Sequence, residues 1–201
     1  MPLTNNIHPI FDDVLQRHSK EALLGQRALV LWFTGLSGAG KSTIANGLER
    51  LLHHHSIATC LLDGDNVRTG LNNNLGFSEA DRNENIRRIA ETAKLFVQNG
   101  IVTLCSFVSP TEAIRLLARQ IIGSNDFFEI FIHTPLSVCE ARDVKGLYRK
   151  ARAGQIPNFT GITAPFEPPQ QPDLIIAGDQ LSIEAAIHQV FEAVIHKIKQ
   201  A

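Results

Sequence analysis

The feature that most constrains the fold of this chain is a glycine-rich segment, Gly35-Leu36-Ser37-Gly38-Ala39-Gly40-Lys41-Ser42-Thr43. It fits the pattern G-x-x-x-x-G-K-[ST] in full. The apolar run 28–34 before it is typical of a buried parallel strand, and apolar residues after it recur at helical spacing as far as Leu52. A strand, a glycine loop and a helix in this order predict a phosphate-binding loop.

Such a loop binds phosphate mainly through its backbone. Glycines let successive N–H groups turn inward, and the following helix adds the partial positive charge of its N-terminus. We expect the Lys41 ammonium to reach the β- and γ-phosphates and the Ser42 hydroxyl to ligate Mg²⁺. The alternative is a glycine-rich turn without a ligand. The complete pattern in its strand–helix context favours binding of a nucleoside triphosphate.

Composition is that of an ordinary globular protein. The 201 residues, 44% of them hydrophobic, suit a single domain over 1–201, and the net charge of −1 favours neither nucleic acid nor membrane as a partner. The sequence has no apolar run long enough for a membrane span and no signal-peptide pattern at its N-terminus. Cys60, Cys105 and Cys139 are far apart. This spacing fits a reducing compartment, so we expect a cytoplasmic location.

Apolar periodicity predicts strands that alternate with helices. The strands are expected at 28–34, 58–62, 101–107, 127–132 and 173–177. The helices are expected at 12–24, from the phosphate loop to about 55, at 78–100, from 109 onward, from 134 onward, and at 183–198. This order predicts an α/β P-loop NTPase-type three-layer fold, with a five-stranded, mostly parallel sheet covered by helices on both faces. Residues 1–26 are expected to be an N-terminal extension packed on the domain.

Polar residues follow the predicted strands at the edge where ligands bind in such folds. Asp63 and Asp65 come after the second strand, and a carboxylate pair there can hold Mg²⁺ through water and orient a hydroxyl. Ser109 follows the third strand. The segment 109–112 has the pattern of a helix start, with a serine cap and proline at the first helical position.

Between 145 and 172 the apolar periodicity stops. The segment is rich in glycine and proline, and its first part carries the basic residues Lys145, Arg149, Lys150 and Arg152. Long irregular insertions in compact domains are usually functional or disordered. A basic segment beside a phosphate loop favours a lid that closes on the nucleotide, with a possible helix over 146–153, although a solvated surface loop is the alternative.

Four blocks of residues closely resemble the adenylylsulfate kinase family. They are Trp32-Phe33-Thr34 with the phosphate loop; Leu62–Arg68 with Leu75–Ser78 and Asp81–Arg88; Phe107–Pro110; and Pro135-Leu136 with Cys139–Asp143, Lys145–Tyr148 and Phe159–Ile162. The second and fourth blocks are specific to the family, and the resemblance covers nearly the whole chain. It implies a stand-alone kinase of sulfate assimilation with ATP and Mg²⁺ as cofactors. The reaction implied is transfer of the γ-phosphate of ATP to the 3′-hydroxyl of adenosine 5′-phosphosulfate. By family analogy we also expect a homodimer.

The resemblance also implies a substrate pocket. Arg68 and Arg82 suit the anion of the acceptor nucleotide, with Asn85 as a polar partner, while Phe77 and Phe166 would lie on either side of its adenine. Without the family resemblance, the sequence fits equally well with Phe77 as a core aromatic residue and with Arg82 as a solvated residue on a helix surface.

Further roles fall on residues around this pocket. Asp65 is assigned to the reacting hydroxyl and to a metal-bound water, with Asp63 in support. Lys145 would stabilise transferring charge, Leu147 would contact the substrate, and Arg142 would cover ATP unless it pairs with Asp143 or Glu140.

Ser109 is often described in the family as a phosphoserine intermediate. Direct in-line transfer needs no covalent step. We therefore expect Ser109 to position substrate and backbone without being an obligatory nucleophile.

Two other functions compete with this interpretation. The first is another small-molecule or nucleotide kinase of the same fold, acting for example on gluconate or shikimate. The second is a GTP-dependent switch, because 143–146 matches D-x-x-G, although the sequence has no Asn-Lys-x-Asp motif for reading guanine.

Overall fold

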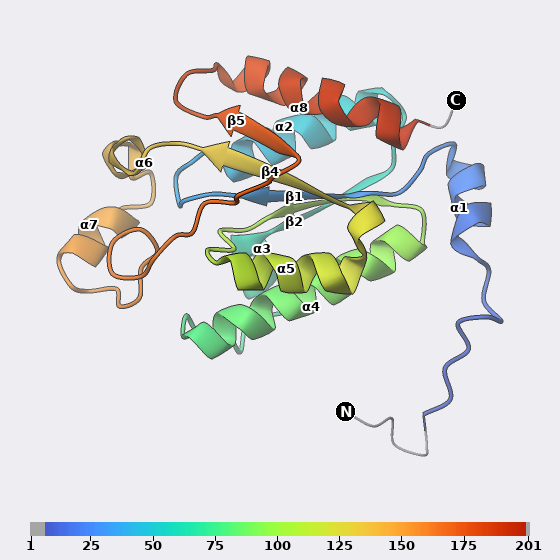
Figure 1. The fold of residues 1–201 in the computed structure, drawn as a ribbon, viewed down its shortest axis with the longest axis horizontal. Helices are drawn as coiled ribbons and strands as arrows, with labels where there is room; N and C mark the ends of the chain where they lie inside the picture. The colour runs from blue at the N-terminus through green and yellow to red at the C-terminus, as the bar shows by residue number, and fades with distance from the viewer. Residues whose placement is uncertain (1–6, 200–201) are drawn as a thin grey trace.

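The computed structural model describes residues 7–199, and within them the chain forms a five-stranded sheet in the order β2-β3-β1-β4-β5 (Figure 1). The strands are β1 (Val30–Thr34), β2 (Thr59–Asp63), β3 (Val102–Ser106), β4 (Phe127–His133) and β5 (Leu174–Ala177). All neighbouring pairs are parallel, so every strand ends at the same edge of the sheet. The predicted α/β fold and its five strands are confirmed.

Helices cover both faces of the sheet. They are α1 (Arg17–Leu24), α2 (Lys41–His54), α3 (Gly64–Arg68), α4 (Glu79–Gln98), α5 (Glu112–Ile122), α6 (Leu136–Arg142), α7 (Leu147–Arg152) and α8 (Ile183–Ile198), with a 3₁₀ turn, η1 (Ser124–Asp126). The pair α2 and α8 packs on one face and the pair α4 and α5 on the other (Figure 1). Within residues 7–199, none of these helices is long and apolar enough to span a membrane.

Strand β1 lies at the centre of the sheet and is buried along its whole length. Its side chains alternate between two clusters. Leu31 and Phe33 join the core beneath α2 and α8, whereas Val30 and Trp32 join the core beneath α4 and α5. Burial on both faces explains why this strand reads as a continuous apolar run.

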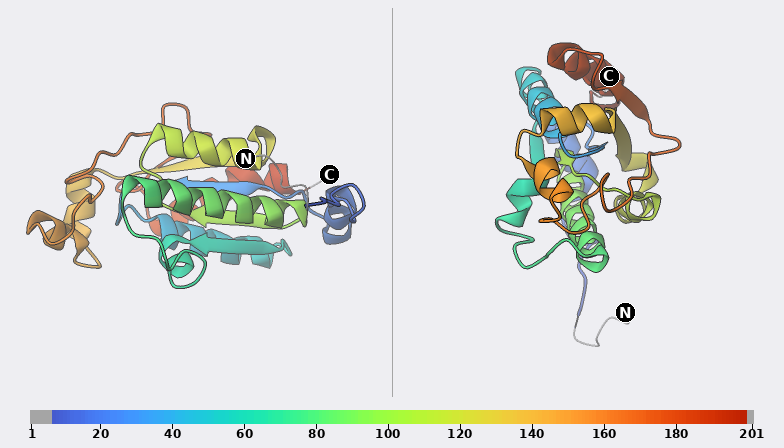
Figure 2. Two further views of the ribbon diagram at one scale, coloured as in Figure 1. Left: turned by 90° about the horizontal axis from the view of Figure 1, so that it is seen from below. Right: turned by 90° about the vertical axis from the view of Figure 1, so that its left-hand side faces the viewer.

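Helices α6 and α7, with the chain that follows them, lie beyond the carboxyl ends of the strands, and α1 lies at the opposite end of the sheet (Figures 1 and 2). The segment 145–172 thus stands on the ligand-binding side. The predicted helix over 146–153 is confirmed as α7.

The N-terminal helix is shorter than predicted. It begins at Arg17 rather than at residue 12, because its anchoring contacts start there. The Arg17 guanidinium forms an ion pair of 2.5 Å with Asp126, and the buried Glu21 carboxylate accepts the Ala28 N–H at 2.7 Å. The preceding Val14 and Leu15 are exposed. Residues 1–6 of the predicted extension lie outside the described part of the chain.

The predicted serine cap at Ser109 is wrong. Helix α5 begins at Glu112, and its N-cap residue is Thr111. Ser109 has a positive φ of 36° and is buried, so its side chain points into the protein and away from the helix end. The hydroxyl is held there by Trp32 and Thr34 of β1, which the local pattern could not reveal.

Candidate active site

The phosphate loop follows β1 and leads into α2, as its pattern predicts. Glycine is required at its start, because a Cβ on Gly35 would lie 2.6 Å from the Ile132 carbonyl oxygen, and φ there is +147°. Gly40, with φ of +109°, precedes the first residue of α2. The helix therefore begins with its free N–H groups facing the loop, which is the arrangement that binds phosphate.

Lys41 begins α2 and is buried within the loop. Its ammonium donates hydrogen bonds to the carbonyls of Gly35 at 3.0 Å and Leu36 at 2.8 Å. Burial lowers the pKa of Lys41 to about 8. A polyanion bound in the loop would favour the charged form of this side chain.

Ser42 and Asp63 meet at the carboxyl edge of the sheet. The Ser42 hydroxyl donates to Asp63 Oδ2 at 2.6 Å and lies 3.2 Å from the Ser106 hydroxyl. Asp63 is also the N-cap residue of α3, and its Oδ1 accepts the backbone N–H of Asp65 in the first turn of that helix. Hydroxyl and carboxylate oxygens are donors that Mg²⁺ prefers, so this pair fits the ion. The sequence interpretation assigned the metal-bound water to Asp65 with Asp63 in support, and of these two carboxylates it is Asp63 that contacts Ser42.

Asp65 instead contacts Lys145. The two side chains form an ion pair between the start of α3 and the segment 145–172, and both are largely exposed. Residues far apart in sequence thus bring one negative and one positive group together beside the phosphate loop. Their exposure means that the pair itself adds little stability.

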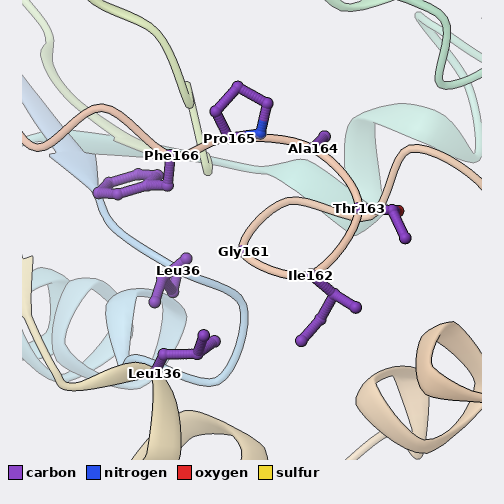
Figure 3. A pocket seen from close by; sticks show the side chains of 8 residues that line it. All are labelled: Leu36, Leu136, Gly161, Ile162, Thr163, Ala164, Pro165 and Phe166. Carbon is purple, nitrogen blue, oxygen red and sulfur yellow. The ribbon is translucent and has the colours of Figure 1, made fainter.

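A cavity of about 520 Å³ lies between the phosphate loop and the segment 161–166 (Figure 3). Leu36 of the loop and Leu136 of α6 form one side, and Phe166 lies on the other. The Phe166 ring stacks on Phe131, with centroids 6.0 Å apart. The cavity is largely apolar, and Phe166 adds one aromatic ring to its lining, which suits a planar base.

Two guanidinium groups gather around Phe77. Arg68 lies over its ring at 4.4 Å and Arg82 at 5.9 Å from the centroid. Burial lowers the pKa of both arginines, and for Arg82 the charge of Arg68 lowers the pKa further. A bound anion would offset the repulsion between these two positive charges. Phe77 is 59% exposed and is not among the described residues that line the cavity with Phe166.

Arg82 also reaches the segment 145–172. It donates to the Asn158 carbonyl at 2.6 Å and to the Thr160 hydroxyl at 3.2 Å. Neighbouring Asn85 is buried, and its Oδ1 accepts a hydrogen bond from Asn72 at 3.0 Å. The N-terminal part of α4 therefore connects the cluster of arginines to the chain around the cavity.

Ser109 is fixed by β1. Its hydroxyl donates to Thr34 at 2.9 Å and accepts the indole N–H of Trp32 at 3.1 Å. Both contacts hold the loop that follows β3 against the central strand. The Ser109 hydroxyl is thus occupied by internal partners.

Arg142 lies against the phosphate loop. Within residues 7–199 it forms no ion pair with Asp143 or Glu140, the two partners considered from the sequence. Its guanidinium donates to the Gly178 carbonyl at 2.9 Å. Glu140 pairs with Arg152, and the Asp143 carboxylate accepts the first N–H groups of α7. The D-x-x-G match at Asp143 is therefore explained by helix capping.

Leu147 lies near the loop but away from the larger cavity. It lines a small cavity of about 60 Å³ together with Ser37, Gly38 and Lys145. Sequence reasoning missed three residues of this region. They are Ser106 beside Ser42; Tyr148, whose hydroxyl donates to the Ser37 carbonyl at 2.8 Å; and Glu167, which contacts α5. Ser106 had a signal in its place near the end of a predicted strand, and Tyr148 had one in the fourth family block, whereas Glu167 had neither.

The parallel sheet, the phosphate loop and the cavity beside it define a nucleotide-binding protein of the P-loop class. The family model described as Adenylylsulphate kinase matches residues 27–177. An adenylyl-sulfate kinase of Bacteroides fragilis is 56% identical over 200 residues, which is 100% of this chain and 99% of that protein. One of Phocaeicola vulgatus is 58% identical over 94% of this chain and 93% of its own length.

Comparison with solved structures points to the same family and fold. An APS kinase of Mycobacterium tuberculosis, in complex with AMPPNP and APS, is 47% identical with a TM-score of 0.81, over 84% of this chain and 98% of that one. A gluconokinase of Sinorhizobium meliloti shares the fold alone, with 12% identity and a TM-score of 0.54 over 85% of this chain and 93% of that one. The chain belongs to the adenylylsulfate kinase family. Its reaction is ATP-dependent phosphorylation of the 3′-hydroxyl of adenosine 5′-phosphosulfate.

Proposed function

We propose that the triphosphate of ATP binds in the loop 35–43 and the adenine of the acceptor in the cavity lined by Phe166. The observation that carries this placement is that Leu36 of the phosphate loop lines the same cavity as Phe166 (Figure 3). Donor and acceptor sites therefore share a wall, as direct transfer between two bound nucleotides requires. The M. tuberculosis relative solved with AMPPNP and APS supports two such sites.

Lys41, Ser42 and Asp63 form the donor side. Lys41 neutralises charge on the β- and γ-phosphates, while Ser42 and Asp63 would hold Mg²⁺ either directly or through water. When bound, Mg²⁺ supplies further neutralisation of the phosphate oxygens. Arg142, whose guanidinium lies beside the loop, covers the nucleotide.

Asp65 and Lys145 form the reacting edge. Asp65 accepts a hydrogen bond from the 3′-hydroxyl and orients it for in-line attack, and Lys145 stabilises charge on the phosphoryl group in transit. Arg68 and Arg82 bind the phosphosulfate, with Asn85 behind them. Ser109 positions the loop after β3, since its hydroxyl is held by Thr34 and Trp32.

Residues 1–201 form one domain. Within it, the segment 145–172 acts as a lid over the nucleotides. It contributes Lys145, Leu147 and Phe166, and Arg82 fastens it to α4. Closure of this lid would exclude water from the transferring phosphoryl group.

We also propose that the protein is a cytoplasmic homodimer. Exposed apolar side chains at Ile10, Phe11 and Leu15 support burial against a second copy, and a solved APS kinase of Thiobacillus denitrificans is hexameric. Light scattering on the purified chain should give twice the monomer mass, and the monomer mass would contradict the proposal.

The placement of the acceptor is tested by Phe166→Ala. Loss of the aromatic wall should raise the KM for adenosine 5′-phosphosulfate about tenfold or more, with the KM for ATP within about twofold of wild type. An unchanged KM for the acceptor would contradict the placement. Leu95→Ala, at an exposed position of α4, is the control for a lost apolar side chain.

A further inference from the structure

Tyr148 joins helix α7 to the phosphate loop. The side chain is buried, and its hydroxyl donates to the Ser37 carbonyl at 2.8 Å. Its ring packs edge-on against Phe159, with centroids 5.0 Å apart. A buried tyrosine hydroxyl usually finds a hydrogen-bond partner. Here the partner is a main-chain carbonyl of the phosphate loop, so the contact fixes the backbone of that loop from outside.

Thr134 makes the same kind of contact two residues further along the loop. It follows β4, is buried, and its hydroxyl donates to the Ala39 carbonyl at 3.0 Å. Gly178, after β5, encloses this bond, because a Cβ there would clash with Thr134 Oγ1 and lie 3.0 Å from the Ala39 carbonyl oxygen. Two buried hydroxyls thus hold alternate carbonyls of one short loop.

These two contacts decide where the next N–H groups of the loop point. The peptide units of the loop are trans, so the C=O and the N–H of each unit point in opposite directions. Tyr148 therefore fixes the N–H of Gly38, and Thr134 fixes that of Gly40. Within residues 7–199 neither N–H group donates to another protein atom. Both remain for an anion, and N–H groups of glycine loops are the donors that hold phosphate.

Tyr148 is also held firmly on its own helix. The Asp143 carboxylate accepts the N–H of Tyr148 at 2.9 Å and that of Arg149 at 3.0 Å. Arg152, in the last turn of α7, forms an ion pair of 2.8 Å with Glu140 of α6. Helix α7 is therefore tied to α6 at both of its ends, and the Tyr148 hydroxyl meets the loop from two joined helices.

We propose that Tyr148 and Thr134 are positioning residues for the donor nucleotide, holding the phosphate loop so that the N–H groups of Gly38 and Gly40 face the phosphates. This inference rests on the proposed binding of the triphosphate in the loop 35–43. Each hydroxyl donates its one proton to the loop, so neither acts on ATP directly. Their loss should weaken phosphate binding and leave the acceptor site unchanged.

The test uses two changes, Tyr148→Phe and Thr134→Val, which each remove one hydroxyl and keep the bulk of the side chain. Each should weaken binding of ATP and of inorganic tripolyphosphate about fivefold in calorimetric titrations with Mg²⁺, as loss of one hydrogen bond implies. The equal effect on tripolyphosphate assigns the loss to the phosphates and not to the base. The KM for adenosine 5′-phosphosulfate should stay within about twofold of wild type. Thr134→Ser, which keeps the hydroxyl, should bind both ligands as wild type does.

Thr103→Val is the matched control, because Thr103 is buried in the first half of β3, away from the carboxyl edge, and its hydroxyl donates to the Ile101 carbonyl at 3.3 Å. It should lower the melting temperature and leave both affinities unchanged. Wild-type affinities in Tyr148→Phe and Thr134→Val, a loss for ATP without a loss for tripolyphosphate, or equally weak binding in Thr103→Val would each overturn the inference.

Lys41→Ala separates this inference from the donor placement on which it rests. If Lys41→Ala weakens tripolyphosphate binding and the two hydroxyl variants do not, the triphosphate does bind in the loop and only the positioning role fails. If Lys41→Ala binds tripolyphosphate as tightly as wild type, the donor placement itself fails.

Discussion

The Ser42 hydroxyl donates a 2.6 Å hydrogen bond to Asp63, which joins the first turn of α2 to the carboxyl end of β2. It also places the two carboxylates that follow β2 against different partners. Asp63 faces the phosphate loop, whereas Asp65 faces Lys145 of the segment 145–172. Under the proposed function, metal binding falls to Asp63 and orientation of the acceptor hydroxyl to Asp65.

Asp63→Asn should reduce turnover about 100-fold and raise the Mg²⁺ concentration needed for half-maximal rate, because a charged oxygen donor is lost beside Ser42. Asp65→Asn should also reduce turnover but leave the Mg²⁺ requirement unchanged. Initial rates across a Mg²⁺ series at saturating nucleotides separate the two. A wild-type Mg²⁺ requirement in Asp63→Asn would contradict this division.

The affinity for ATP should depend on pH through Lys41. Its pKa is lowered to about 8 by burial, and a bound triphosphate would raise it again. Below pH 8 the ammonium is charged with or without ATP, so the Kd stays constant. Above pH 8 binding must take up a proton, and the Kd should rise by up to about tenfold per pH unit. Calorimetric titration between pH 7 and 10 measures this, and a constant Kd over that range would refute it.

Arg82→Ala should loosen the lid. The guanidinium bonds to Asn158 and Thr160, so its removal should speed proteolysis within 154–164 and raise the KM for the acceptor several-fold. Arg87→Ala is the matched control, because Arg87 pairs only with Glu84 on the same exposed helix face in the described structure. Equal proteolysis of the two variants would show that Arg82 does not hold the lid.

Ser109→Ala should retain most of its turnover, since direct transfer needs no covalent intermediate. The variant should lose about 1–2 kcal/mol of unfolding free energy, because the Trp32 indole N–H loses its acceptor and the Thr34 hydroxyl loses one of its hydrogen bonds. Urea denaturation followed by the fluorescence of Trp32, the one tryptophan of the chain, measures the stability. Phosphate trapped on Ser109 at a kinetically competent rate would disprove the positioning role.

The sequence predicted the layers of this fold because each element carries its own signal. Apolar runs marked β1 to β5, and the helix expected at 78–100 is α4, whose N-cap residue Ser78 accepts the Asp81 N–H with its hydroxyl. Such signals lie within a few residues of the element that they define. The phosphate loop is the clearest case, because one local pattern specifies both its backbone and its ligand.

The errors concern contacts between distant segments. Ser109 looked like a helix cap because the pattern around it is correct, but Trp32 and Thr34, which hold its hydroxyl, come from β1. The side chain that accepts a hydrogen bond from the first N–H of α5 is Glu167, from the segment 145–172. Likewise, the partner of Asp65 became evident only when Lys145 was placed opposite it. Periodicity carries no information about which loops meet at a sheet edge.

The most direct test of the account is ADP release in a coupled assay, with and without adenosine 5′-phosphosulfate. The account predicts strong stimulation by this acceptor, formation of 3′-phosphoadenosine 5′-phosphosulfate in equal amount to ADP, and near-complete loss of both in Lys41→Ala, which keeps its fold. ADP release at the ATP-only rate when the acceptor is supplied would contradict it.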